Sequence, residues 1–393
     1  MADVDSISLR IGRDTVQIDI DIYRSLFDNS VVHRYKKYED TLAKKSILFA
    51  DLATLSRKAD IPYALFFAPK AVVKKNVDRK NKELLQGVTK STFSLNSRGS
   101  IELRDIELIV KDLLRKQGLL KTYKKVGDNK LLGCIRGSRL SVVGQADIVR
   151  GITSIDNSAM RSMSKKRTLD YLIYLLENQN VFVSQSSRFF MPQLIHDSTT
   201  FSGVCIRDRK FPFVFLNNKD ELKSFEPEGR KIFTLTLLAV CVAKAKFSPI
   251  SYNDQSKNLI VDNLYRVTEE LLMPEGSVRR ITITSLNDLK SESDLFSVTP
   301  SALLMRLQRF KLLDAPTIRE YRSTLKDEFN KASPRKARTP KAVNGFKKYN
   351  GPAYSKAVLE LVDNGRITKR EARRVLMQNK ESIGFLEEYR MNL

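Results

Sequence analysis

The N-terminal segment alternates apolar and polar residues. In residues 7–23, Ile18, Ile20 and Ile22 are separated by single polar residues, and a turn signal begins at Gly12. Alternation with a period of two is typical of a half-buried strand. The pattern predicts a β-hairpin over residues 7–23.

The pattern then changes to helical spacing. Between residues 35 and 125 the apolar residues recur every three or four positions, as at Ile106 and Ile109, with basic residues between them. This predicts a helical, basic unit in which Gly118 ends the main turn of its clearest helix. Residues 127–151 contain more glycine and β-branched residues, which predicts a short β or loop region.

The middle of the chain predicts one helix, several strands and a second helix. The first helix covers residues 169–176, and the strands cover 181–183, 203–206 and 211–216. The segment FTLTLLAVCVAK, residues 233–244, is apolar on every side, which is typical of a buried helix. This order predicts a helix-rich α+β fold with a small sheet, because alternating βαβ units are absent.

The last third is helical and basic. Thr299 and Pro300 supply an N-cap hydroxyl and a proline at the first helical position. In the helix that follows, Arg306 and Arg309 are expected on the polar face, opposite Leu303. We therefore treat both arginines as candidate phosphate contacts.

A basic stretch precedes the C-terminal helices. Residues 332–348 contain six basic residues, two prolines and no acidic residue, which predicts a mobile linker. Its arginines and lysines, including Arg335, Lys336 and Arg338, either contact nucleic acid or only keep the linker solvated.

A helix, a tight turn and a second helix follow this linker. The first helix covers residues 354–362, and Thr368 with Glu371 forms a capping box for the second. Basic side chains are dense around the second helix, and either contact phosphates or form a solvated face. They are Arg366, Lys369, Arg370, Arg373 and Arg374.

Composition and charge narrow the class of protein. The 393 residues are 42% hydrophobic, which predicts a globular chain of two or three domains, and the net charge of +24 favours a polyanionic partner. Cys134, Cys205 and Cys241 are widely spaced among apolar residues, which predicts buried thiols. With no long apolar run, we expect a cytoplasmic protein without a membrane partner.

The candidate nucleic-acid contacts are therefore basic residues of the last third, and DNA is the expected nucleic acid. Aromatic residues do not alternate with them in the sequence, as a single-strand stacking site would require. The complete set is Arg306, Arg309, Arg335, Lys336, Arg338, Lys369, Arg370, Arg373 and Arg374.

Residues 201–244 resemble the core of the ImmA/IrrE family of zinc metallopeptidases. In that family, a strand with a proline and a terminal asparagine precedes a helix that reads Phe-Thr-Leu-x-His-Glu-x-x-His. Here residues 213–217 match the strand, and Phe233, Thr234 and Leu235 match the start of the helix. The resemblance implies a metallopeptidase-like core flanked by regions that resemble helix-turn-helix domains.

The positions that carry the family's chemistry differ in this chain. The two histidines and the glutamate correspond to Leu237, Cys241 and Leu238, and leucine cannot bind zinc or exchange a proton. For the third ligand, Asp262 is the only candidate acid in the corresponding segment, with Asn258 and Asn263 nearby. We therefore expect no catalytic residue, no metal and no cofactor.

An alternative zinc site would have to be assembled from distant segments. It would combine Cys241 and Asp262 with one of the two histidines, His33 or His196. An ordinary structural role for each of these residues is the preferred interpretation.

The resemblance extends over most of residues 52–376 and suggests a domain organisation. Residues 52–69 look like the family segment that follows an Xre-type helix-turn-helix. The expected divisions are an N-terminal hairpin with a basic helical domain at 1–150, a degenerate peptidase-like domain at 151–280, a helix-turn-helix-like region at 281–331, the linker at 332–348 and a C-terminal helical pair at 349–393.

The resemblance implies a regulator from a phage or mobile element. We expect a pseudo-metallopeptidase that binds nucleic acid, or a DNA-bound repressor or host defence protein, and acts by occlusion. Two alternatives stay open at this point. One is a hydrolase or toxin with relocated chemistry, and the other is a structural or assembly protein associated with nucleic acid.

Overall fold

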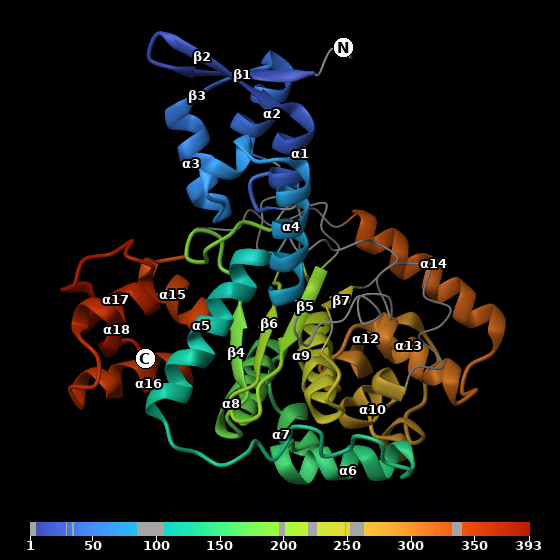
Figure 1. Cartoon of the computed structure of the whole chain (residues 1–393). Helices are drawn as coiled ribbons and strands as arrows, with labels where there is room; N and C mark the ends of the chain where they lie inside the picture. Colours follow the sequence, from blue (N-terminus) through green and yellow to red (C-terminus); the bar gives the residue numbers. More distant parts are fainter. Residues whose placement is uncertain are drawn as a thin grey trace. The chain divides into compact units, whose positions relative to one another are not determined.

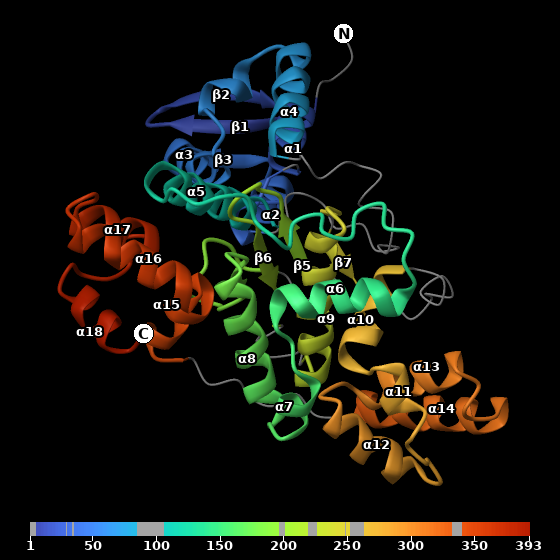
Figure 2. The same ribbon diagram turned by 90° about the horizontal axis from the view of Figure 1, so that it is seen from below.

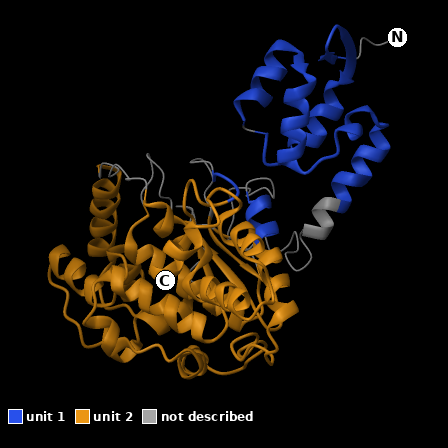
Figure 3. Ribbon diagram, turned by 90° about the vertical axis from the view of Figure 1, so that its left-hand side faces the viewer, with its two compact units in different colours: residues 1–89, 100–112, 192–199 blue, residues 90–99, 113–191, 200–393 orange. Residues whose placement is uncertain are grey.

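The computed structural model divides the chain into two compact units (Figure 3). Unit 1 comprises Met1–Thr89, Ser100–Asp112 and Pro192–Thr199, and unit 2 comprises Lys90–Gly99, Leu113–Met191 and Thr200–Leu393. The structure describes residues 5–28, 30–33, 35–84, 106–195, 201–218, 226–247, 249–251, 263–331 and 340–393. Unit 2 includes residues on both sides of residue 150.

Unit 1 contains a three-stranded sheet in the order β2-β1-β3. The strands are β1 (Ser6–Ile11), β2 (Asp14–Asp19) and β3 (Ser46–Leu48). β1 and β2 form the antiparallel hairpin that the sequence predicts, with Gly12 in the left-handed region at a φ of 61°. β3 pairs with β1 in parallel, which the sequence pattern did not indicate.

Helices pack on this sheet through an aromatic core. They are α1 (Ile20–Asp28), α2 (Lys36–Lys44), α3 (Phe49–Ala59), the 3₁₀ helix η1 (Tyr63–Phe67) and α4 (Lys70–Leu84). The rings of Tyr23, Phe27 and Phe66 contact one another in the interior. The described residues between 35 and 84 are mostly helical, as predicted, with β3 as the exception.

The predicted hairpin is too long at its C-terminal end. The chain becomes helical at Ile20, where the Asp19 side chain accepts a hydrogen bond from the Asp21 backbone N–H at 2.8 Å. In a helix, Ile20, Tyr23 and Phe27 lie on one face and are all buried. The apolar spacing here fits both periods, and packing selects the helix.

Residues 107–123 are helical, as predicted, whereas residues 142–161 are more helical than the sequence predicts. α5 (Glu107–Tyr123) continues through Gly118, so the expected end there is wrong. α6 (Val142–Thr153) and α7 (Asn157–Arg161) follow. The predicted β or loop region at 127–151 is therefore wrong from residue 142 onward, where the Ser141 side chain caps α6 by accepting from the Gly144 N–H at 3.1 Å.

Unit 2 is built on a four-stranded mixed sheet in the order β4-β6-β5-β7. The strands are β4 (Phe182–Gln185), β5 (Phe201–Ile206), β6 (Phe213–Leu216) and β7 (Pro249–Ser251). β4 and β6 are parallel, and the β5–β6 and β5–β7 pairs are antiparallel. The three strands predicted from the sequence are confirmed, and the helix-rich α+β class is correct.

The apolar segment of residues 233–244 forms most of α9 (Glu228–Ala243), in the interior of unit 2 (Figure 1). It packs between the sheet, α8 (Lys165–Asn178) and α10 (Asn263–Leu272). Gly203 on β5 allows the close approach, since a Cβ there would lie 2.7 Å from the Phe215 backbone oxygen and 2.9 Å from Leu238 Cδ1. The prediction of a buried helix is confirmed.

A group of helices follows α10 (Figure 2). They are α11 (Glu275–Val278), α12 (Leu286–Leu295), α13 (Pro300–Arg309) and α14 (Ala315–Lys331). Thr299 caps α13, as predicted, by accepting from the Ala302 N–H at 3.2 Å. These elements cover the region that was expected to resemble a helix-turn-helix.

The chain ends in a helical bundle, α15 (Ala342–Asn350), α16 (Pro352–Asp363), α17 (Lys369–Met377) and α18 (Phe385–Met391). Residues 332–339 of the predicted linker lie outside the described residues, but residues 342–348 form most of α15. The linker prediction is wrong for these, because Val343 and Phe346 are buried. In the described part of the chain, no helix is long and apolar enough to cross a membrane.

Candidate nucleic-acid interface

α17 presents basic residues on one face and packs its other face into the C-terminal bundle. The capping box predicted from Thr368 and Glu371 starts the helix, with the Thr368 hydroxyl accepting from the Glu371 N–H at 3.1 Å. Ala372, Val375 and Leu376 are buried. We define the α17 surface as Arg366, Lys369, Arg370, Arg373 and Arg374.

The α17 surface contains both paired and unpaired cations. Lys369 forms an ion pair with Glu387 at 3.0 Å, and Arg373 donates to the Asn379 side chain at 3.3 Å. Arg366 and Arg370 are exposed and form no ion pair with any described residue. These two guanidinium groups are available to an anion from solution.

Arg374 is also exposed, and its charge acts on a carboxylate of its own helix. Hydrogen bonds from the Thr368 backbone and side chain lower the pKa of Glu371, and the charge of Arg374 lowers it further. The Glu371 carboxylate is therefore held beside Arg370 in the first turn of α17, whereas Arg374 extends the positive charge into its last turn.

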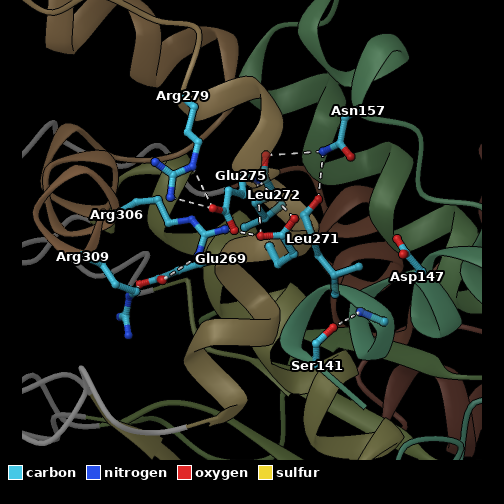
Figure 4. Close-up of polar contacts among 12 residues, drawn as sticks. Ser141, Asp147, Asn157, Glu269, Leu271, Leu272, Glu275, Arg279, Arg306 and Arg309 are labelled. Atoms are coloured by element: carbon cyan, nitrogen blue, oxygen red, sulfur yellow. Dashed lines mark hydrogen bonds and ion pairs between the residues drawn. The ribbon is translucent and has the colours of Figure 1, made fainter. Parts of the chain in front are cut away.

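Arg306 does not belong to an exposed surface. Its side chain is 3% exposed and forms ion pairs with Glu270 and, at 3.5 Å, with Glu269 (Figure 4). Its guanidinium also lies 4.4 Å from the centroid of the Phe310 ring. The prediction that Arg306 lies on the polar, solvent-facing side of α13 is wrong, because acidic residues of α10 pair with its guanidinium and cover it.

Arg309 takes part in the same network. It forms an ion pair with Glu269 at 2.9 Å, and its side chain is 12% exposed. Burial raises the pKa of Glu269, while the charges of Arg309 and Arg306 oppose that rise. The two arginines thus join α13 to α10 and leave little guanidinium surface for a phosphate.

Further polar contacts hold the C-terminal end of α10 (Figure 4). The Asn157 side chain donates to the backbone oxygen of Leu271 at 2.8 Å, and Arg279 pairs with Glu275 at 2.8 Å. The Glu275 N–H donates to the Glu270 carboxylate at 3.1 Å. This cluster is a structural anchor between helices of unit 2.

The predicted contacts in the basic stretch cannot be placed. Arg335, Lys336 and Arg338 lie outside the described residues. The candidate interface therefore rests on α17.

The positions that correspond to the peptidase motif lie in the core. Leu237, Leu238 and Cys241 are at most 2% exposed. The Cys205 thiol donates to the Leu238 backbone oxygen at 3.3 Å, and burial together with the nearby Cys241 raises the pKa of Cys205. The three cysteines are free thiols; Cys205 and Cys241 are buried, and Cys134 is half-buried.

Only some of the residues of the alternative zinc site lie in the part of the chain that the structure describes. Asp262 and His196 lie outside the described residues, and His33 belongs to unit 1, with its Nδ1 3.3 Å from the Ser30 oxygen. Among the described residues, no group of three or more His, Cys, Asp or Glu side chains is arranged to hold a metal ion.

An aromatic residue beside α17 was missed in the sequence. Lys380 follows the helix and donates to the backbone oxygen of Phe189 at 2.9 Å and of Met191 at 3.2 Å. The Phe189 side chain is 52% exposed. Phe189 and Lys380 are 191 positions apart in sequence, so only tertiary packing brings this aromatic residue to the chain that follows the basic helix.

Comparison with protein-family models, curated proteins and solved structures finds no match to this chain. The resemblance of residues 201–244 to the ImmA/IrrE core stays a prediction from the sequence.

Proposed function

We propose that this chain is a non-hydrolytic protein that binds nucleic acid through the α17 surface. It regulates by occluding the nucleic-acid site to which it binds. The observation that carries the proposal is the pair of exposed guanidinium groups, Arg366 and Arg370, that have no ion-pair partner among the described residues. Arg374 extends this charge along the helix.

The electrostatics of the whole chain support a polyanionic partner. A net charge of +24 attracts phosphate backbones over long range, and exposed guanidinium groups bind phosphate with two parallel hydrogen bonds. Contacts of this kind position a protein on the backbone and read little sequence. The proposed activity is therefore binding with weak sequence preference.

The core position of α9 supports a role without hydrolysis by this helix. Leu237 and Leu238 have no lone pair to offer a metal, and both are enclosed by other side chains. Two parts of the proposal rest on the sequence resemblance alone. The first is an origin in a phage or mobile element, and the second is a DNA-bound repressor or defence protein as a further partner. Occlusion of a shared DNA site would then be the regulatory step.

A salt titration tests the proposal. We expect the double substitution Arg370→Ala/Arg374→Ala to weaken binding to a labelled oligonucleotide and to flatten the plot of log affinity against log salt. Two lost phosphate contacts correspond to a decrease in slope of about 1.4 to 1.8. Fluorescence anisotropy between 50 and 200 mM salt measures this slope.

The matched control removes two exposed arginines that are ion-paired elsewhere in unit 2. Arg209 pairs with Asp128 at 2.8 Å and Arg279 pairs with Glu275 at 2.8 Å. We expect Arg209→Ala/Arg279→Ala to leave the slope nearly unchanged. An identical loss in both double variants, or no loss in either, would contradict the assignment of the α17 surface.

A further inference from the structure

We propose that the α17 surface binds single-stranded nucleic acid and that the ring of Phe189 is a stacking platform for an unpaired base. This inference rests on the proposed function and adds the class of nucleic acid. It combines the exposed arginines of α17 with an aromatic residue that the fold places at the end of the same helix.

The backbone that carries Phe189 is fixed to the chain that leaves α17. Lys380 Nζ donates to the Phe189 and Met191 oxygens at 2.9 and 3.2 Å, and Gln378 Nε2 donates to the Phe190 oxygen at 3.4 Å. Three consecutive carbonyl groups of one segment are therefore bound by two side chains that follow the helix. Arg373 reaches the same turn through Asn379.

The neighbouring residue explains why Phe189 points outward. Phe190 is buried against Gly345, where a Cβ would lie 2.1 Å from its ring, and its centroid lies 4.9 Å from that of Phe346. Because the Phe190 ring is held in the interior, the side chain of Phe189, the preceding residue, is left 52% exposed. A ring held on an anchored backbone loses less conformational entropy when a base stacks on it.

The surroundings of Phe189 are positively charged. The Arg188 guanidinium lies 5.3 Å from the centroid of the Phe189 ring. An aromatic ring beside cations is the combination that single-strand binding proteins use, since the cations hold phosphates and the ring stacks on a base of any sequence.

The N-terminal end of α17 favours a single strand over duplex DNA. In a helix-turn-helix, residues at the start of the recognition helix reach base edges in the major groove. Here that end holds the Glu371 carboxylate in its capping box, and Lys369 is paired with Glu387. The Glu371 carboxylate at this end would face phosphates; Arg366 and Arg370 lie at this end as well, whereas Arg374 and the backbone of Phe189 lie toward the other end.

The experiment compares a labelled 12-nucleotide oligothymidylate with a 12-base-pair duplex. We expect Phe189→Ala to weaken single-strand binding about tenfold, which corresponds to about 1.4 kcal/mol, and to leave duplex binding unchanged. The salt slope should stay the same, because stacking releases no counterions. Phe189→Tyr should keep most of the affinity.

Phe329 on α14 provides a matched control. It is 48% exposed and has the Arg230 guanidinium 5.3 Å from its ring centroid, but Arg230 is ion-paired with Glu226 at 3.6 Å. We expect Phe329→Ala to bind the single strand like the parent chain. Unfolding curves of both alanine variants confirm that the fold is retained.

The outcomes separate this inference from the proposed function. If Arg370→Ala/Arg374→Ala weakens binding but Phe189→Ala does not, or if the duplex binds more tightly than the single strand, the inference is overturned and the proposed function stands. If the parent chain binds neither oligonucleotide, the proposed function itself is overturned.

Discussion

Arg306 and Arg370 have the same side chain in opposite surroundings. Both lie on helices with apolar residues at three- and four-residue spacing, yet Arg306 is enclosed by Glu269 and Glu270 whereas Arg370 faces solvent. Burial of a guanidinium requires nearby carboxylates, because an unpaired charge loses its hydration in the interior. The acidic partners of Arg306 come from a different helix, so its own segment could not reveal them.

Glu177 is a buried acid whose protonation state depends on pH. It lies at the end of α8 and its carboxylate accepts a hydrogen bond from the Ala353 N–H, at the start of α16, at 3.0 Å. Burial raises the pKa of Glu177 to about 7, although backbone hydrogen bonds from Ala353 and Val183 and the charge of Lys356 oppose the rise. The acid therefore stays protonated in the folded chain at a pH where it ionises in the unfolded chain.

We expect Glu177→Gln to reduce the dependence of stability on pH. Between its ordinary pKa of 4.5 and about 7, Glu177 ionises only in the unfolded chain, so the parent chain loses stability as the pH rises through this window. The loss reaches about 3 kcal/mol by pH 8. The glutamine keeps an acceptor for Ala353 and does not ionise.

Urea unfolding at pH 5 and pH 8 measures this effect. The difference in unfolding free energy between the two pH values should be smaller in Glu177→Gln than in the parent chain. Glu388→Gln, at an exposed acid on α18, is the control and should leave the difference unchanged. An equal difference in all three proteins would contradict the role assigned to Glu177.

At the scale of elements, α9 is the clearest case in which the sequence predicts the environment. Leu235, Leu237 and Leu238 point in different directions around the helix and are each at most 1% exposed. A helix surrounded by a sheet on one side and by α8 and α10 on the others needs apolar residues all round. Its apolar sequence is therefore a consequence of its position.

We expect Leu238→Ala to destabilise the chain by about 2 to 5 kcal/mol, because the cavity beside Gly203 and Cys205 cannot close fully. Leu140→Ala, at a residue that is 52% exposed, should change stability by less than about 0.5 kcal/mol. Urea unfolding followed by circular dichroism compares the two. Equal effects at both leucines would show that α9 is not packed as described.

At the scale of the whole molecule, the C-terminal bundle is part of unit 2. The Ser184 hydroxyl on β4 donates to the Tyr349 oxygen, and Tyr354 packs edge-on against Phe182 and Phe213 of the sheet. Lys116 of α5 lies 4.0 Å from the Tyr349 ring centroid. The α17 surface therefore belongs to a helical bundle that packs against the central sheet of unit 2.

This arrangement predicts that the bundle and the sheet unfold together. The chain contains no tryptophan, so Phe385→Trp in the bundle and Phe247→Trp in the core of unit 2 give separate fluorescence reporters. We expect their urea midpoints to coincide with each other and with circular dichroism. An earlier transition in the fluorescence of the Phe385→Trp variant alone would mean that the bundle folds as a separate domain.

The sequence by itself determined the helix-rich α+β class, the three strands at residues 181–216, the buried helix α9 and the caps at Thr299 and Thr368. These features depend on neighbours within a few positions, where periodicity and capping act. Tertiary structure decided the rest. The apolar spacing of residues 20–23 fits two periods until packing selects a helix, and residues 342–348, predicted as a linker, form a helix whose Val343 and Phe346 are buried.

The features of the candidate site also divide into those that the sequence indicates and those that only the tertiary structure decides. Charge density on α17 is visible in the sequence, but the burial of Arg306 and the position of Phe189 beside Lys380 depend on contacts between distant segments. An arginine's partners and a phenylalanine's exposure are set by what packs against them, and local spacing carries no information about that. The sequence therefore determined which helix is basic, and only the fold decided which of its neighbours complete a binding surface.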